Sequence, residues 1–362
     1  MYNLNMQLKG HFNTLVKNML SPISFDVGID LGTANTRVGV KDPTHIKIEP
    51  SVVAINKATN DILAVGQKAK NMLGKTPANV VAVRPLKDGV IVDFETTLAM
   101  LKHFISVARE LALTSNPLAK PRVLIGVPIT VTDVEKEATI DAAIYAGAKE
   151  AYVIEEPIAA AIGIGLPINT PSGNMVVDIG GGTTDITIIS LGGIVIDKTI
   201  KIAGDEMDDA IMEYVKNQYN LLIGPQSAEV LKKQLGNLMP DPNHPQKAIV
   251  HGVDMNTRLP KSLDVSDIDI AEALHPIISR ITDSIKEAFE EAPPEIVADL
   301  RERGLVITGG ASQLKNLDVF WTQELHIKVK RAPEPQLSVL KGILNALDNI
   351  EYIRKIQEKP LI

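Results

Sequence analysis

The chain has 362 residues, of which 45% are apolar and 22% charged, with a formal net charge of −7 at pH 7 and no cysteine. These values are typical of a soluble globular protein of about two domains, and the lack of cysteine excludes disulfides, thiolate metal sites and cysteine nucleophiles. The acidic balance argues against a nucleic-acid partner, and no apolar run approaches the ~20 residues of a membrane-spanning helix.

The first 25 residues contain two lysines and no acidic residue. They lack the apolar stretch and the cleavage site of a signal peptide. On a helix, six apolar side chains of residues 1–20 fall within an arc of about 80°: Met1, Leu4, Leu8, Phe12, Leu15 and Met19. This pattern predicts an amphipathic helix that binds a membrane surface. The alternative is a helix that packs on the protein's own surface or on a partner.

Two apolar strands lead into turns of the same pattern. Residues 25–31 (FDVGIDL) and 174–179 (NMVVDI) are nearly continuous apolar runs, as in buried strands. The turns that follow, 30–36 (DLGTANT) and 178–184 (DIGGGTT), share Asp, an aliphatic residue, Gly and a Thr six residues after the Asp. One such turn has an even chance of being an ordinary loop, whereas two predict a duplicated domain whose halves face each other.

The remaining elements predict an α/β protein with mainly parallel sheets. Each turn is followed by a return strand, and further strands and helices alternate along the chain. The predicted strands are 37–40, 121–127, 152–154, 186–191 and 305–308, and the predicted helices include 133–145, one from Pro157, 227–235 and one near Ser312. Thr132 and Glu135 have the pattern of a capping box at the start of the predicted helix 133–145. Residues 237–262 are rich in Pro, Asn and Asp and predict a loop-rich subdomain.

The two turns have the composition of a phosphate-binding site. Glycine allows backbone N–H groups to approach a polyphosphate closely, and threonine and asparagine add hydroxyl and amide donors. Asp30 and Asp178 each end a buried strand and are expected to point into the cleft between the halves. Two carboxylates at that place suit a hydrated Mg²⁺, which prefers oxygen ligands and keeps several waters.

Glu156 and the pair Glu229 and Lys232 have two interpretations each. Glu156 precedes a helix, where a carboxylate commonly caps the helix or interacts with its dipole. Alternatively, it orients the water that attacks a γ-phosphate, with Thr183 nearby. Glu229 and Lys232 lie three residues apart on a predicted helix, where an exposed ion pair is the simpler explanation. The chain has no P-loop, no Gly-x-Gly-x-x-Gly, no Gly-x-Ser-x-Gly and no metal-ligand spacing of histidines.

Over about residues 26–350 the sequence resembles the MreB family of bacterial actin homologues, which are rod-shape-determining proteins. The resemblance rests on GIDLGTANT (28–36), EPSVVAI (49–55), VGQKAKNMLGKTPANVVAVRPLKDGVI (65–91), IEEPIAAAIGIGLP (154–167), NMVVDIGGGTTDITIISLGG (174–193) and ITGGASQL (307–314). It implies an actin-like (ribonuclease H-like) α/β fold, with duplicated domains and four subdomains around a central nucleotide cleft. It also implies ATP-dependent assembly into filaments.

The resemblance also implies a role for each matching position. The phosphates of ATP or ADP would contact Thr33, Ala34, Asn35, Gly180, Gly181 and Gly182. The nucleoside would contact Glu229, Lys232, Gly309, Gly310, Ala311 and Ser312. Asp30 and Asp178 would bind Mg²⁺ through water, and Glu156 and Thr183 would position the lytic water. The chain departs from the family pattern at Asp185, where Glu is usual, and at Ala311, where Gly is usual. These departures bear on turnover and nucleotide preference rather than on the fold.

The expected organisation is an amphipathic segment at 1–25, domain I at 26–167, domain II at 168–345 and a C-terminal helix at 346–362 that packs on domain I. Small subdomains are expected at about 50–95 and about 206–264. The expected function is that of a slow ATPase (ATP and water to ADP and phosphate) that polymerises into membrane-associated filaments and determines cell shape. Such a protein would be cytoplasmic, at the inner face of the membrane.

Three other functions fit parts of the pattern. A filament-forming paralogue for motility in a wall-less helical bacterium would share all of these motifs, and its partners would be motility rather than cell-shape proteins. A small-molecule kinase of the same superfamily needs an acceptor pocket and a base, and no residues distinct from the ATP-binding ones suggest them. An Hsp70-type chaperone ATPase normally carries a substrate domain after the ATPase domain.

Overall fold

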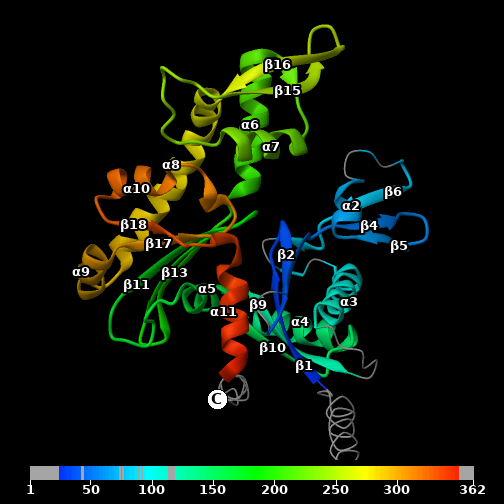
Figure 1. Cartoon of the computed structure of the whole chain (residues 1–362), viewed down its shortest axis with the longest axis vertical. Helices are drawn as coiled ribbons and strands as arrows, with labels where there is room; N and C mark the ends of the chain where they lie inside the picture. Colours follow the sequence, from blue (N-terminus) through cyan, green and yellow to red (C-terminus); the bar gives the residue numbers. More distant parts are fainter. Residues whose placement is uncertain are drawn as a thin grey trace, which may run out of the picture.

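The computed structural model describes residues 24–349, apart from 42–44, 73–74, 76, 88–89, 92 and 113–118. It shows two lobes that face each other across an opening (Figure 1). The predicted membrane-binding segment, residues 1–20, lies outside the described residues, as does most of the predicted C-terminal helix 346–362.

A five-stranded mixed sheet forms the centre of the first lobe. Its order is β10 (Glu150–Glu155), β9 (Lys120–Val127), β1 (Ser24–Leu31), β2 (Asn35–Val40) and β3 (Ile46–Pro50). Strands β10, β9 and β1 are parallel, whereas β2 is antiparallel to both β1 and β3. The apolar run of β1 is buried on both faces, which explains why its sequence does not alternate.

The second lobe repeats the same connectivity. Its sheet has the order β18 (Val329–Arg331), β17 (Leu305–Thr308), β11 (Asn174–Ile179), β12 (Thr184–Ser190) and β13 (Gly193–Ile200), with the same parallel and antiparallel pairings. The predicted duplication is therefore confirmed. The prediction of mainly parallel sheets is wrong, because each matched turn closes an antiparallel hairpin and only half of the pairings in each sheet are parallel.

Each large sheet carries a small antiparallel sheet as an insertion after its third strand. In the first lobe this sheet consists of β4 (Val53–Asn56), β5 (Ile62–Val65) and β6 (Val80–Val83), followed by the short pair β7 (Leu86–Lys87) and β8 (Val90–Ile91). In the second lobe it consists of β14 (Leu221–Leu222), β15 (Lys247–Asp254) and β16 (Pro260–Ser266). The predicted loop-rich character of 237–262 is thus wrong for the hairpin β15–β16. The predicted domain boundaries stay predictions.

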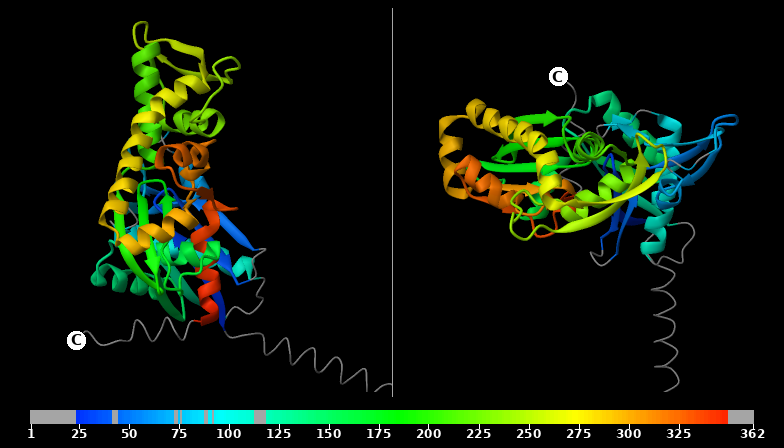
Figure 2. Two further views of the ribbon diagram at one scale, coloured as in Figure 1. Left: turned by 90° about the vertical axis from the view of Figure 1, so that its left-hand side faces the viewer. Right: turned by 90° about the horizontal axis from the view of Figure 1, so that it is seen from above.

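Helices cover both lobes. They are α2 (Gln67–Lys70), α3 (Phe94–Leu111), α4 (Asp133–Tyr145), α5 (Glu156–Ile164), α6 (Gly204–Tyr219), α7 (Pro225–Leu235), α8 (Asp267–Glu291), α9 (Pro294–Arg303), α10 (Leu317–Leu325) and α11 (Ser338–Ala346), with 3₁₀ turns at Ala311–Gln313, Pro335–Leu337 and Leu347–Asn349. The capping box predicted for α4 is present between Thr132 and Glu135. Helix α8 runs from the small sheet to the large sheet of the second lobe (Figure 2).

The lobes are joined by two helices that each pack on the other lobe's sheet. Helix α5 contacts β11 and β12, whereas α11 contacts β1, β2 and β9. The two helices cross backbone to backbone: a Cβ on Gly163 would lie 1.9 Å from the carbonyl oxygen of Ser338, and one on Gly342 would lie 1.7 Å from that of Ala159. Around the crossing, a buried apolar cluster that includes Leu340 and Ile343 links the two sheets.

Candidate functional site

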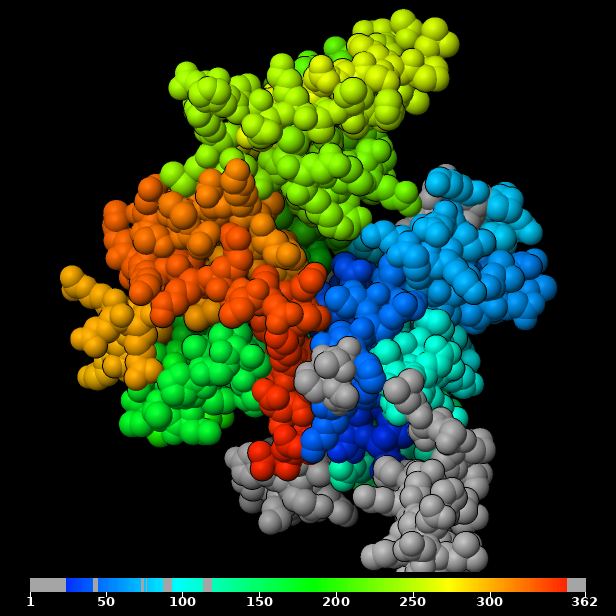
Figure 3. Space-filling model, viewed as in Figure 1, coloured from blue at the N-terminus to red at the C-terminus, as the bar shows by residue number. Residues whose placement is uncertain are grey.

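A cleft of about 950 Å³ lies between the lobes. Its volume is near the upper end of the range of about 300–1,000 Å³ that is usual for small-molecule pockets. The space-filling view shows the surface hollowed between the two lobes (Figure 3). Both halves of the duplication line this cleft, so it has the size and position expected for a site shared between them.

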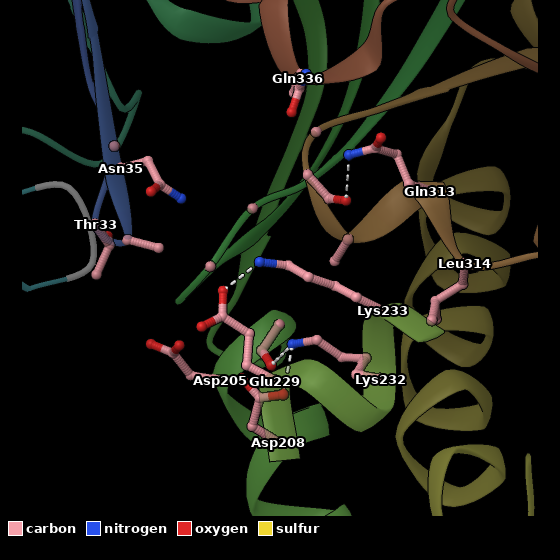
Figure 4. A pocket seen from close by; sticks show the side chains of 18 of the residues that line it. Thr33, Asn35, Asp205, Asp208, Glu229, Lys232, Lys233, Gln313, Leu314 and Gln336 are labelled. Carbon is pink, nitrogen blue, oxygen red and sulfur yellow. Dashed lines mark hydrogen bonds and ion pairs between the residues drawn. The ribbon is translucent and has the colours of Figure 1, made fainter. Parts of the chain in front are cut away.

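The two matched turns meet inside this cleft. The first is held by Ser51, whose Oγ donates to the carbonyl oxygen of Gly32 (2.6 Å) and whose backbone N–H donates to that of Ala34 (3.1 Å). A Cβ added at Gly181 in the second turn would lie 2.6 Å from the Cβ of Ala34. Only glycine at this position allows the turns to approach so closely. Across the opening from Thr33 and Asn35 lie the helical residues of the second lobe (Figure 4).

Most of the residues predicted for the site line the cleft. Two of them do not: Gly182 and Ser312 are buried outside its wall. The hydroxyl of Ser312 donates to the carbonyl oxygen of Gly309 (2.8 Å), so this residue shapes the turn after β17. The cleft-lining members of the predicted set are Asp30, Thr33, Ala34, Asn35, Glu156, Asp178, Gly180, Gly181, Thr183, Glu229, Lys232, Gly309, Gly310 and Ala311.

The turn after β17 requires a glycine next to a predicted metal ligand. Gly309 has a φ of +86°, which favours glycine, and a Cβ there would lie 2.2 Å from the Oδ1 of Asp178. Its backbone N–H donates to the carbonyl oxygen of Pro335 (3.0 Å). The sequence Gly309-Gly310 therefore marks the place where the turn passes directly beside the carboxylate that ends β11.

Four carboxyl groups gather at the floor of the cleft. Asp30 ends β1, Asp178 ends β11, Asp185 lies on β12 and Glu156 begins α5. Burial is the main cause that raises the pKa of Glu156 well above its usual value, followed by the charges of Asp30, Asp185 and Asp178. Burial likewise raises the pKa of Asp178 to about 7, with Asp185 and Asp30 adding to it.

Asp185, the departure from the family pattern, is fixed by two hydroxyl groups. Burial raises the pKa of Asp185 to about 6. Hydrogen bonds from the hydroxyls of Thr199 (2.6 Å) and Thr183 (3.4 Å) act in the opposite direction and lower it. The hydroxyl of Thr183 thus faces a carboxylate on its own hairpin. Glu156 is not the N-cap residue of α5: Glu155 holds that position, and its side chain makes no capping hydrogen bond. Glu156 lies in the first turn of α5, where a carboxylate interacts favourably with the helix dipole.

The floor has the composition of a site for a hydrated cation. Crowded buried carboxylates resist ionisation unless a cation neutralises them. The pKa values of Glu156 and Asp178 are raised for this reason. Among the described residues, no group of three or more His, Asp or Glu side chains is placed to hold a metal ion directly. Carboxylate oxygens are the ligands that Mg²⁺ prefers, so the residues of the floor fit a hydrated Mg²⁺ ion.

The predicted nucleoside residues have partners that the sequence did not suggest. Glu229 pairs with Lys70 (3.0 Å) and Lys233 (2.6 Å), and Lys232 pairs with Asp208 (2.8 Å), so the ion pair expected from the spacing of Glu229 and Lys232 is not formed. Although burial raises it, the pKa of Glu229 is lowered to about 2 by Lys233 and Lys70. Figure 4 shows Glu229, Lys232, Lys233 and Asp208 on the second lobe's side of the cleft.

Two ion pairs cross the mouth of the cleft between the small sheets' subdomains. Lys70 on α2 reaches Glu229 on α7, and Arg84, which follows β6, pairs with Asp205 at the start of α6. The amide of Gln226 also donates to the carbonyl oxygen of Lys70 (3.4 Å). In this structure the outer parts of the two lobes are thus in contact.

Arg37 is a site residue that the motif comparison missed. It lies on β2 directly opposite Asp30 on β1, and its Nη1 donates to the Oδ2 of Asp30 (2.8 Å). The hairpin register would have found it, because a turn between Asp30 and Thr36 places residue 37 opposite the aspartate. A second missed residue, Asp208, holds Lys232.

Comparisons with known proteins agree with this arrangement. The family model described as MreB/Mbl protein matches residues 24–355. The cell shape-determining protein Mbl of Bacillus subtilis (strain 168) is 47% identical over 330 residues, which span 91% of this chain and 98% of that protein.

Solved structures extend this similarity to three dimensions. MreB5 of Spiroplasma citri, solved bound to ADP, is similar with a TM-score of 0.84 and 35% identity over 92% of this chain and 98% of that one. MamK, solved as a double helical filament, shares the fold with a TM-score of 0.74 at 23% identity over 90% and 99% of the two chains. None of the helices in the described part of the chain has the length and apolar character needed to cross a membrane.

Proposed function

This chain belongs to the MreB/Mbl family of actin-like cell shape-determining proteins, and from that premise we propose that it binds ATP in the cleft between its lobes and polymerises into membrane-associated filaments. The observation that carries the proposal is the meeting of the two matched turns, with Gly181 against Ala34, above a floor of carboxylates. Nucleotide binding is also supported by the structure of the Spiroplasma citri relative with ADP.

The proposed roles follow from the position of each residue. The turns at 32–35 and 180–182 would bind the phosphates through backbone N–H groups, although Gly182 is buried outside the cleft wall. Glu229 and Lys232, which line the cleft together with Gly309, Gly310 and Ala311, would contact the nucleoside. Ser312 would contribute by holding that turn rather than by contact with the nucleotide.

Asp30 and Asp178 would hold Mg²⁺ through its waters, and the ion would neutralise charge on the phosphates. Glu156 at the start of α5 would accept a hydrogen bond from the attacking water and orient it, with the hydroxyl of Thr183 as a second contact. Because phosphoryl transfer depends mainly on positioning and electrostatics, this set of residues supports a slow ATPase coupled to polymerisation.

We propose a role in cell shape rather than motility, because the relative at 47% identity is a cell shape-determining protein. The similarity to MamK is one of fold, and it agrees with self-association into filaments as the mode of action. The kinase alternative gains no support, because the sequence offers no acceptor pocket or base distinct from the proposed nucleotide-binding residues.

Pelleting in the ultracentrifuge is the direct test of the proposed function. We expect more protein in the pellet with ATP than with ADP or without nucleotide, and filaments in electron micrographs of the ATP sample, because the nucleotide bridges the lobes and fixes their relative position. A protein that stays monomeric under all three conditions would refute the filament proposal, and one that also fails to bind ATP would refute the nucleotide site.

Membrane attachment through residues 1–20 is the second part of the proposal. Deletion of this segment is expected to abolish co-sedimentation with liposomes of anionic lipid, because six half-buried apolar side chains contribute several kcal/mol, at about 1.5–3 kcal/mol each for full burial. Replacement of Lys9 and Lys17 by glutamine is the control, and it should cost less, since each lysine adds only about 1 kcal/mol near anionic lipid. Unchanged co-sedimentation of the truncated protein would exclude the segment as the anchor.

A further inference from the structure

Arg37 is the cation of the cleft floor. Its side chain is only 14% exposed, and that of its partner Asp30 is 6% exposed. The charge of Arg37 acts on Asp30, Asp178 and Glu156, and in each case it opposes the burial that raises the pKa of the carboxyl group. Because guanidinium is protonated at every accessible pH, this charge is permanent, whether or not a metal ion is present.

The position of Arg37 combines a metal-ligand partner with the phosphate-binding turn. Its Nη1 donates to Asp30 Oδ2 at 2.8 Å and lies 3.5 Å from the carbonyl oxygen of Asn35. Its buried Nε has no hydrogen-bond partner among the described residues. A Cβ at Gly32 would lie 3.5 Å from the same Nη1. The guanidinium therefore lies directly beneath the turn that is proposed to hold the phosphates.

A fixed cation at this place has two opposite effects on nucleotide binding. Without Mg²⁺, it offsets the repulsion between four carboxyl groups and the phosphate tail. With Mg²⁺, it occupies an oxygen of Asp30 and repels the incoming ion, so it weakens the metal's contribution. Arg37 therefore raises the nucleotide affinity without Mg²⁺ and lowers it with Mg²⁺. Both changes reduce the difference between the two affinities.

On the basis of the proposed function, we propose that Arg37 is a resident counter-ion that makes the binding of a nucleoside diphosphate or triphosphate only weakly dependent on Mg²⁺. It is a positioning residue: it holds Asp30 in place from the opposite strand of the hairpin and supplies positive charge under the phosphates. It thereby neutralises part of the negative charge that a hydrated divalent ion would neutralise in a cleft lined by carboxylates alone.

A purely structural role for Arg37 predicts a different result. If the pair with Asp30 served only to hold β1 and β2 together, its loss would weaken nucleotide binding to the same extent with and without Mg²⁺. The ratio of the two dissociation constants separates the interpretations, and it is independent of any measurement of ATP hydrolysis.

The experiment measures the dissociation constant of a fluorescent ADP analogue at constant ionic strength, with excess MgCl₂ or with EDTA. For the wild-type chain we expect the two constants to agree within about tenfold. Arg37→Gln, which keeps an N–H donor and removes the charge, should increase the ratio by about tenfold or more, mainly by weakening binding in EDTA. Arg37→Lys, which keeps the charge, should restore most of the wild-type ratio.

Arg122→Gln is the matched control. Arg122 pairs with Asp26 near the other end of β1, with its Nε 2.7 Å from Oδ1, and it does not line the cleft. Its replacement should leave the ratio unchanged. An unchanged ratio in Arg37→Gln would overturn the proposal. A wild-type ratio above about tenfold would also overturn it, and this measurement does not require that Arg37→Gln folds. Failure of the wild type to bind ADP in both buffers would instead refute the nucleotide site itself.

Discussion

Glu156→Gln is expected to lower the rate of ATP hydrolysis by about 100-fold or more, within the range of about 10²–10⁴ that a positioned acid or base contributes. The substitution keeps the shape of the side chain and removes the carboxylate that would orient the attacking water. Nucleotide affinity should be retained, because glutamine keeps the size of the side chain and Glu156 is not among the residues proposed to contact the nucleotide. Single-turnover phosphate release and a separate ATP-binding titration measure the two quantities.

Glu155→Gln is the matched control for this result. Glu155 is the preceding residue, has a side chain that is 37% exposed, and lies 3.5 Å from Lys136. Since it is not part of the cleft wall, hydrolysis by this variant should stay within about twofold of the wild type, as expected for a surface substitution. A wild-type rate in Glu156→Gln would show that this residue does not position the water.

Gly342→Ala is expected to destabilise the fold by about 3 kcal/mol, at the upper end of the usual cost of overpacking. The new Cβ would lie 1.7 Å from the carbonyl oxygen of Ala159, which is backbone and cannot rotate away. The helices α5 and α11 must therefore move apart, and close packing around them is lost. The measurement is the midpoint of urea unfolding followed by circular dichroism, together with its slope.

The control for this substitution is Gly193→Ala, at an exposed position where the nearest atom to a new Cβ is 3.8 Å away. It should change stability by no more than about 0.5 kcal/mol. The double variant Gly163→Ala/Gly342→Ala adds a second check. Both changes separate the same pair of helices, so the double variant should lose less stability than the sum of the losses in the two single variants. Full additivity, or a stable Gly342→Ala, would contradict the close crossing.

The strands of the large sheets could be predicted because burial on both faces leaves a clear signal. Residues 174–179 and 305–308 are nearly continuous apolar runs, and the structure has strands with those bounds. The duplication was visible because the two turns have the same residue types at matching positions, and both turns close equivalent hairpins in the structure. The hairpin β15–β16 was missed because it has one exposed face and is preceded by a segment rich in Pro, Asn and Asp.

The side-chain partners in the cleft could not be predicted, because they depend on how distant segments meet. Helical spacing suggested Lys232 as the partner of Glu229, yet Lys70 from the other lobe holds that carboxylate. Arg37 was within reach of prediction, since the hairpin register alone places it opposite Asp30. Ser312 matched a family motif, but its burial behind Gly309 follows only from the 3₁₀ turn at Ala311–Gln313.

The ion pairs across the cleft mouth, Lys70 with Glu229 and Arg84 with Asp205, have a mechanical consequence. All four side chains are between 26% and 42% exposed, and pairs so open to water contribute about 1 kcal/mol or less each. The helix crossing at the opposite end of the cleft is part of a buried core. The two lobes are therefore joined firmly at one end of the cleft and held only by weak contacts at its mouth, so we expect separation at the mouth to cost far less free energy than disruption of the helix crossing.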